Sequence, residues 1–205
     1  MSRRLKIVLA STSPRRKELL RQLDFPFEAV DPGEVLEAAS GRPEEVVSMN
    51  SMAKALRVAE GLEAGIVIGA DTVVVKGGTI LGKPESPSDV EEMLRSLRGS
   101  VHRVLTGIAV VDAESGHTES EVVETRVRML PLSDVQIRLY VETGEPIGKA
   151  GGYAIQGLGA ILIEEVHGCF YNVVGLPLSK LNEVLGRFDH QIFSNIRSRA
   201  DPARD

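Results

Sequence analysis

Apolar and amphipathic segments alternate along this chain of 205 residues. Short uninterrupted apolar runs are typical of buried strands, whereas apolar residues three and four apart indicate a helix with one buried face. The pattern predicts strands at residues 5–10, 25–30, 66–75, 79–81, 103–111, 117–129, 160–166 and 171–174. It predicts one helix that begins at Pro14 and further helices over residues 44–62, 88–97, 133–143 and 177–185.

Strands and helices interleave, which favours an α/β fold. The turn at residues 112–116 folds one strand back on the next, so we expect a mixed β-sheet flanked by helices. With no interdomain linker in view, residues 1–187 are predicted to form a single domain. Residues 188–205 carry few aliphatic side chains and many charges, and we predict a polar, flexible tail there.

Two helices have recognisable starts, since Ser13 and Ser133 are suitable N-caps and Pro14 suits a first helical position. The long helix over 44–62 is expected to bury one apolar face. The candidates for that face are Val46, Val47, Met49, Met52, Ala53, Leu56 and Ala59.

Composition is that of an ordinary globular protein, with 42% hydrophobic and 26% charged residues. The net charge of −5 argues against a protein that coats DNA or RNA. No apolar run approaches the roughly 20 residues that span a bilayer. The single cysteine, Cys169, excludes an intramolecular disulfide and favours a small buried apolar role over that of a nucleophile. We therefore expect a cytoplasmic protein with no stable nucleic-acid partner and no membrane attachment.

Two arginines stand at the start of the first helix, in the sequence Ser-Thr-Ser-Pro-Arg-Arg of residues 11–16. A helix N-terminus carries partial positive charge, so Arg15 and Arg16 are locally unfavourable there. An anion bound at this turn would resolve the conflict, and Ser11 and Ser13 would add hydroxyl donors. The alternative is a capped helix with two solvated arginines, and both remain open at this point.

Asp71 interrupts the strongly apolar strand predicted over residues 66–75. A carboxylate in such a strand is costly unless it is paired, bound to a metal or open to a cleft. Gly69 and Ala70 leave room for a ligand to approach the backbone. The alternative is an exposed aspartate at a strand end, but the pattern favours a functional carboxylate.

Further candidates are Lys54 on the long helix and Lys83 in the turn that follows the short strand 79–81. The glycine-rich run 151–159 lacks the spacing of a dinucleotide fingerprint. Within it, Gln156 offers a donor and an acceptor suited to the edge of a base, although a plain glycine-rich hairpin is the alternative. The chain has no phosphate-binding P-loop, no Cys/His zinc cluster and no serine-nucleophile elbow, and its four histidines are scattered.

Six ordered motifs within residues 5–187 resemble those of the Maf proteins, a family of nucleotide pyrophosphatases. The motifs are residues 9–16, 69–72, 82–84, 106–107, 149–157 and 172–178. The resemblance implies an elongated mixed sheet in two lobes around a cleft, related to the inosine-triphosphate pyrophosphatases. It implies hydrolysis of a nucleoside triphosphate to the monophosphate and pyrophosphate with a divalent cation, Mg²⁺ or Mn²⁺, and it suggests a homodimer.

The same resemblance assigns roles to the cations and to Asp71. Asp71 would be the general base that activates water for attack at the α-phosphorus. Arg16, Lys54 and Lys83 would hold the triphosphate and neutralise charge in the transition state, and Ser11 would contact the same substrate.

The resemblance also implies a metal site that is built from two carboxylates, of which Asp71 is the first. The family's second carboxylate belongs to an Asp-Glu pair that is broken in this chain. Glu37 is therefore our choice and Glu34 the alternative. The segment before Lys54 also departs from the family's Arg-x-x-Ala pattern.

Substrate choice within the family follows three motif positions, which are Arg15, Thr72 and Gln156 in this chain. These residues look like the dTTP/UTP set, whereas the 7-methyl-GTP set tends to have Trp, Gln and Glu. A neutral amide can pair with the O4 and N3–H face of uracil or thymine. We expect a dTTP and UTP pyrophosphatase, with modified pyrimidine nucleotides as further candidates. The alternatives are a 7-methyl-GTP or broad-specificity enzyme and, from another class, a non-catalytic regulator of septum formation.

Overall fold

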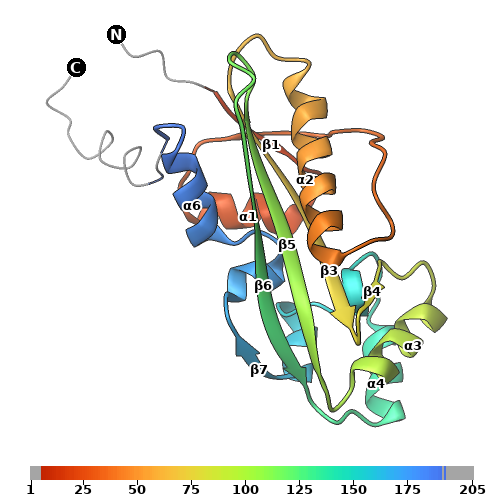
Figure 1. Ribbon diagram of the computed structural model, residues 1–205. Helices are drawn as coiled ribbons and strands as arrows, with labels where there is room; N and C mark the ends of the chain where they lie inside the picture. Colours follow the sequence, from red (N-terminus) through yellow and green to blue (C-terminus); the bar gives the residue numbers. More distant parts are fainter. Residues whose placement is uncertain (1–5, 191, 193–205) are drawn as a thin grey trace, which may run out of the picture.

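A computed structural model describes residues 6–190 and residue 192, and it confirms the predicted mixed α/β fold (Figure 1). Seven strands within these residues form one sheet in the order β2-β1-β3-β5-β6-β7, with β4 paired to β3. The strands are β1 (Ile7–Ala10), β2 (Glu28–Val30), β3 (Ile66–Lys76), β4 (Thr79–Leu81), β5 (Val101–Asp112), β6 (Thr118–Met129) and β7 (Ile163–His167). The helices are α1 (Pro14–Gln22), α2 (Pro43–Ala59), α3 (Pro87–Leu97), α4 (Asp134–Glu142), α5 (Phe170–Val174) and α6 (Leu178–Gly186), with 3₁₀ turns η1 (Ala150–Gly152) and η2 (Gly157–Leu162).

The long strand β3 has a stretch without a neighbour on one side. Its first part pairs in parallel with β1, which ends where Ala10 meets Gly69. Its last part pairs with β4, beginning where Val74 meets Leu81. Between these pairings, residues 70–73 pair with β5 and with no other strand of the described chain. Side chains and ligands can therefore approach the middle of the sheet at this gap.

The sheet is covered on both faces because successive side chains of a strand point to opposite sides. In β1, Ile7 and Leu9 join a core with α1 and α6, whereas Val8 and Ala10 join a core with α2. A further core, which includes Val74, packs against α3 and α4. In Figure 1, α2 runs along the sheet, while α3 and α4 lie together at its lower end. We refer to the part of the molecule around the core of α1 and α6, and to the part around the core of α3 and α4, as its two lobes.

Helix α2 packs unusually close to the sheet, because two glycines lie beneath it. A methyl group on Gly69 would overlap the Ser51 carbonyl, and one on Gly107 would overlap the Val47 carbonyl. The predicted face of this helix was accordingly wrong in part, since Met49 is 61% exposed and Leu56 41% exposed. The buried face consists of Val46, Val47, Asn50, Ser51, Ala55, Val58 and Ala59. Small side chains take the place of methionine and leucine where the backbones nearly touch.

The prediction of a strand at residues 171–174 is wrong, because this segment forms the short helix α5. The buried side chain of Asn172 explains the difference. Its Nδ2 donates to the Val104 carbonyl at 2.9 Å and to Thr125 Oγ1 at 3.0 Å. These tertiary contacts override the β-propensity of the apolar run, and Gly175 ends the helix in the left-handed region at φ 118°.

Two other predictions concern the start of α4 and the C-terminal tail. Ser133 caps α4 in a capping box with Gln136, as predicted. In the predicted tail, Phe188 packs against the core and Ile192 is buried, so these positions are packed. Residues 193–205 lie outside the described residues. No helix in the described chain is both long enough and apolar enough to cross a bilayer.

Gly107→Ala is expected to lower the free energy of unfolding by about 3 kcal/mol, because the added methyl group would push α2 away from the sheet. For a chain of this size, that corresponds to a fall of roughly 6–12 °C in melting temperature. Gly82→Ala is the matched control, because that position faces open space. Thermal unfolding by circular dichroism measures both, and equal melting temperatures would contradict the close packing of α2.

Candidate active site

A cavity of about 620 Å³ opens at the gap beside β3, between the two lobes. Ile155 and Val174 line it from the core of α1 and α6, and Val74 and Tyr153 line it from the core of α3 and α4. Most of the predicted site residues line this one cavity. They are Ser11, Arg15, Arg16, Glu37, Lys54, Asp71, Thr72 and Lys83.

Asp71 occupies the gap in β3 with 13% of its side chain exposed. Its Oδ1 accepts from Lys54 Nζ at 2.7 Å, and its Oδ2 accepts from Asn50 Nδ2 at 3.1 Å. Lys54 also pairs with Glu37 Oε1 at 2.8 Å. Both oxygens of the carboxylate are thus stabilised, which is what a largely buried charge requires. The structure brings Asp71, Lys54 and Glu37 into one cluster.

Asn50 was not predicted, yet it builds this cluster from α2. It is 3% exposed, and its amide accepts from Ala38 N–H at 2.7 Å and donates to the Ala38 carbonyl at 3.1 Å. This two-bond clamp fastens the loop to the helix, directly beside Glu37. Glu34 does not line the cavity, whereas Glu37 does and shares Lys54 with Asp71 as its ion-pair partner. The sequence signal that could have identified Asn50 is a polar residue among the apolar positions of the buried face of α2.

Arg16 is held from several sides. Its Nε donates to the Gly175 carbonyl at 2.8 Å, its Nη2 donates to Thr72 Oγ1 at 3.0 Å, and its Nη1 lies 3.4 Å from Ser11 Oγ. Burial lowers the pKa of the Arg16 guanidinium, and the negative charge of Asp71 acts in the opposite direction. The side chain remains a cation, because arginine is protonated throughout the range of protein stability.

The hydroxyl of Thr72 links Arg16 to a second threonine, Thr106. Thr106 Oγ1 donates to the buried Asn172 carbonyl at 3.0 Å and lies 2.9 Å from Thr72 Oγ1. Since the Thr106 proton is used there, Thr72 must donate to Thr106 and accept from Arg16. In this geometry Thr72 orients Arg16. Thr72 also lines the cavity, so its predicted contact with substrate stays a prediction.

The first turn of α1 has free amide groups next to these cations. Ser13 occupies the N-cap position as predicted, but its side chain makes no capping hydrogen bond. Its own N–H donates to Ser11 Oγ at 3.2 Å. Unsatisfied N–H groups and the helix dipole make this turn suited to an anion. The geometry supports the anion site over a self-contained capped helix.

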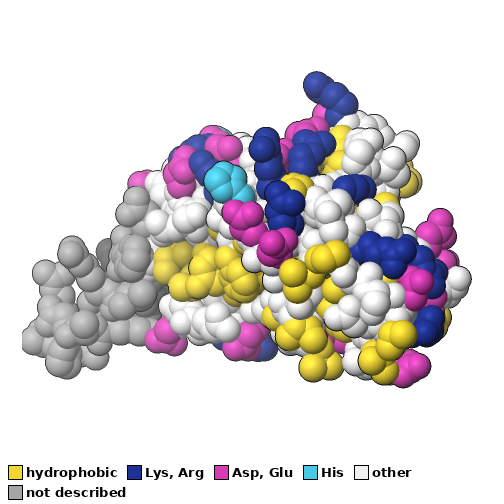
Figure 2. All heavy atoms as spheres, turned by 90° about the horizontal axis from the view of Figure 1, so that it is seen from below, with side chains coloured by type: hydrophobic (Ala, Val, Ile, Leu, Met, Phe, Trp, Pro, Cys, Tyr) yellow, Lys and Arg dark blue, Asp and Glu magenta, His cyan; other side chains and the backbone are white. Residues whose placement is uncertain are grey.

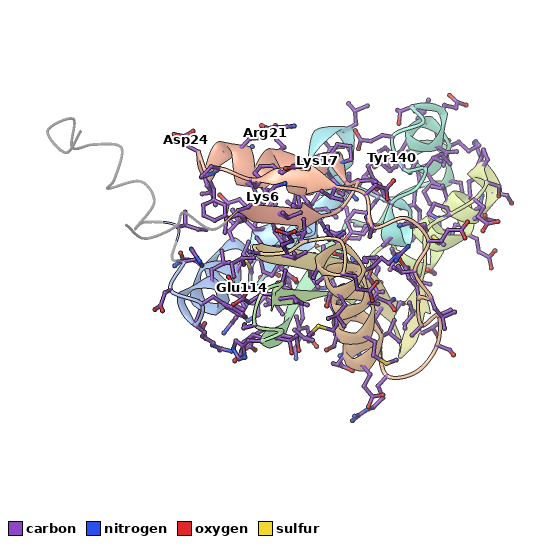
Figure 3. All side chains as sticks on the ribbon, turned by 90° about the horizontal axis from the view of Figure 1, so that it is seen from above. Lys6, Lys17, Arg21, Asp24, Glu114 and Tyr140 are labelled. Carbon is purple, nitrogen blue, oxygen red and sulfur yellow. The ribbon has the colours of Figure 1, made fainter. Side chains whose placement is uncertain are left out.

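Arg15 belongs to a second charged corner of the cavity. Figure 3 shows α1 running from Arg21 and Lys17 toward Tyr140 of α4, so the N-terminal end of α1 faces that corner. Burial lowers the pKa of Arg15, and Tyr140 and Glu145 partly offset this shift. Lys149, which was not predicted, also lines the cavity there and donates to the Glu145 carbonyl.

Of the two remaining predicted residues, Lys83 lines the cavity and Gln156 does not. Lys83 is exposed at the cavity and has no hydrogen bond or ion pair with the described residues, so its ammonium is available to a ligand. Gln156 does not line the cavity, although Tyr153 and Ile155 of the same run do. The run is not a hairpin, because residues 150–152 and 157–162 form the 3₁₀ turns η1 and η2.

Tyr153 on the cavity wall is fixed from behind by His102, which is 2% exposed. The His102 Nε2 atom lies 2.7 Å from the Tyr153 hydroxyl, and His102 Nδ1 has no hydrogen-bond partner among the described residues. If Nδ1 carries the proton, the Tyr153 hydroxyl donates to Nε2 and only the Nδ1–H group is unsatisfied. If Nε2 carries the proton instead, both Nδ1 and the hydroxyl proton of Tyr153 are unsatisfied. The first tautomer is therefore favoured. Burial, with a smaller contribution from Lys76, lowers the pKa of His102 to about 4.

The cavity therefore gathers five cations against three carboxylates in a chain of net charge −5. The cations are Arg15, Arg16, Lys54, Lys83 and Lys149, and the carboxylates are Asp31, Glu37 and Asp71. Fold and site together define a mixed α/β protein whose cavity is suited to a polyanionic ligand beside a paired carboxylate.

The chain matches a known protein family along most of its length. The model of the Maf-like protein family matches residues 6–188, and the chain belongs to that family. A Methanosarcina mazei relative named dTTP/UTP pyrophosphatase is 46% identical, covering 92% of this chain and 96% of its own. A relative of the same name from Pelotomaculum thermopropionicum is 47% identical, covering 91% and 98%. The structure of the Staphylococcus aureus Ham1 protein is 18% identical with a TM-score of 0.46, covering 77% of this chain and 79% of its own.

The lowered pKa of His102 predicts a pH dependence of stability. The unfolded chain takes up this proton near pH 6.5, before the folded protein does so near pH 4. The contribution of neutral His102 is thus complete above about pH 6.5 and is lost as the pH falls toward about 4. His102→Gln cannot titrate, so its loss of stability between these pH values should be smaller by about 3 kcal/mol. Urea unfolding at both pH values measures this difference, and equal losses would contradict the prediction.

Proposed function

We propose that this protein hydrolyses UTP and dTTP to the nucleoside monophosphate and pyrophosphate. The observation that carries the proposal is the cluster of Asp71, Lys54 and Glu37 at the edge of a cavity lined by cations. Membership of the Maf-like family and the names of close relatives support the same reaction.

The triphosphate fits the cationic side of the cavity. The amides of the first turn of α1, the fixed guanidinium of Arg16 and the unpaired ammonium of Lys83 present donors to phosphate oxygens. Because Arg16 is already oriented by protein groups, it needs little reorganisation when substrate binds. Charge that develops on the leaving pyrophosphate would be neutralised by these same groups.

Asp71 is suited to the role of general base. It lies in the gap of β3, where water and substrate can reach a carboxylate that is otherwise buried. In the proposed step Asp71 accepts a proton from water while the water oxygen bonds to the α-phosphorus. The bond from the α-phosphorus to the bridging oxygen breaks, and pyrophosphate leaves with that oxygen.

A divalent cation fits the donor set in part. Asp71 and Glu37 both lie within ion-pair distance of Lys54 Nζ, so two carboxylates converge on one point. No group of three or more potential ligands exists among the described residues. Mg²⁺ commonly takes one or two carboxylates and completes its shell with water and substrate phosphates. When bound, such an ion would screen the phosphate charge during the displacement.

The preference for a pyrimidine base rests on the corner that holds Arg15. Lys149 and Tyr153 lie on the same cavity wall, and Gln156 follows directly on Ile155. We propose that Arg15 and Gln156 select uracil and thymine by their carbonyl and N–H edge. For this contact the side chain of Gln156, which does not line the cavity, has to turn toward the base. A 7-methyl-GTP preference is the competing assignment within the family.

Location and assembly also stay predictions. We propose a cytoplasmic enzyme that acts on free nucleotides, with a homodimer as the expected assembly. Figure 2 shows basic and acidic side chains mixed in one part of the face seen from below, with apolar ones gathered beside them. This face carries no broad basic stripe of the kind that typically binds nucleic acid. Together with the net charge of −5, this supports a small-molecule substrate over a regulator that binds DNA or RNA.

The first test is pyrophosphate release from a panel of nucleotides with Mg²⁺ or Mn²⁺. UTP and dTTP should be turned over best, and Asp71→Asn should lower kcat by about a thousandfold or more, because the amide cannot accept the proton. Circular dichroism should show that this variant remains folded. Failure to hydrolyse any triphosphate would refute the proposed enzymatic activity. A preference for 7-methyl-GTP would refute only the proposed selection of a pyrimidine nucleobase.

Thr72→Val tests whether Thr72 acts through Arg16. The change removes the hydroxyl that Arg16 Nη2 uses, with little change of volume. We expect KM for UTP to rise by about tenfold. Thr72→Ser keeps the hydroxyl and should behave like wild type. If both variants matched wild type, Thr72 would have no part in orienting Arg16.

A further inference from the structure

Lys54 forms ion pairs with two carboxylates of the cavity. Its ammonium lies 2.7 Å from Asp71 Oδ1 and 2.8 Å from Glu37 Oε1. The side chain is 12% exposed, and it reaches the cavity from α2. Lys54 therefore stands at the point where a divalent cation shared by Asp71 and Glu37 would have to bind. One ammonium and one cation cannot both hold that point.

The other cavity cations are placed differently. Arg16 is fixed by hydrogen bonds to Gly175 and Thr72 and makes no ion pair with the two carboxylates. Lys83 pairs with no carboxylate of the described chain, and Lys149 bonds to a backbone carbonyl. Only Lys54, among the five cations of the cavity, neutralises the carboxylates directly.

We propose that Lys54 is an exchangeable counter-ion, which gives up Asp71 and Glu37 to the divalent cation and turns its ammonium to the phosphates of the substrate. This inference rests on the proposed function. It assigns Lys54 two positions, one that keeps the carboxylates neutralised before substrate arrives and one that serves the substrate afterwards.

The chemistry of lysine suits this exchange. Its ammonium is a compact charge on a flexible four-carbon stem, so it can rotate while the backbone of α2 stays in place. The helix itself is held by its close approach to Gly69 and Gly107. Asn50 keeps its hydrogen bond to Asp71 Oδ2, so the carboxylate retains one fixed donor when Lys54 leaves.

The consequence is a penalty on metal binding in the free protein, because the cation must first break the ion pairs of Lys54. Removal of the ammonium should remove the penalty. In Lys54→Met, the Kd for Mn²⁺ without nucleotide should fall by about tenfold or more. The amplitude of the free Mn²⁺ signal in electron paramagnetic resonance measures this Kd.

Two controls separate the proposal from a general effect of charge. Lys83→Met removes one positive charge from the same cavity without touching Asp71 or Glu37, and it should change the Kd for Mn²⁺ much less. Lys54→Arg keeps a cation between the carboxylates and should not bind Mn²⁺ more tightly than wild type. Should Lys54→Met fail to fold by circular dichroism, Lys54→Gln carries the same test with a neutral hydrogen-bond donor.

An unchanged or weaker affinity in the folded Lys54→Met or Lys54→Gln variant would overturn the proposal. Equal tightening in Lys83→Met would also overturn it, since the effect would then be one of net charge. The result can be read without turnover. Absence of pyrophosphate release from every nucleotide would refute the proposed function and leave the Mn²⁺ comparison intact.

Discussion

The charge of Asp71 within the central sheet is the constraint on which the site depends. A carboxylate that is largely buried in an apolar strand needs a cation and hydrogen-bond donors. Helix α2 supplies both, as Lys54 and Asn50, and it can do so because Gly69 and Gly107 let its backbone approach the strands. The same helix, through Asn50, holds the loop that carries Glu37. One close helix–sheet contact thus assembles both acidic groups of the site.

The gap along β3 converts this buried charge into an accessible one. Because β1 ends opposite Gly69 and β4 begins opposite Val74, the strand edge between them faces a cavity. The carboxyl end of β1 leads into α1, so the helix N-terminus meets the gap. Sites outside the carboxyl ends of strands are common in α/β folds for this topological reason.

A row of buried and partly buried polar groups supports the phosphate-binding side. Arg16 donates to Thr72, Thr72 to Thr106, and Thr106 to the carbonyl of Asn172 in α5. Asn172 in turn bonds to Val104 and Thr125 in the neighbouring strands. A guanidinium that is oriented by groups which are themselves fixed meets the general requirement for a preorganised site. The short helix α5, formed in place of a strand, is part of this support.

The sequence by itself determined most elements and the family, and it identified eight of the side chains that line the cavity. Strand runs and helical spacing are local, and a lone carboxylate in an apolar run or two arginines at a helix start conflict with local physics wherever the chain folds. Tertiary structure decided what those residues do to one another. It chose the face of α2 through the glycines beneath it, turned residues 171–174 into a helix through Asn172, and brought Glu37 rather than Glu34 to Lys54. It also directed the hydroxyl of Thr72 toward Arg16. These outcomes depend on contacts between segments far apart in the chain, and no local pattern contains them.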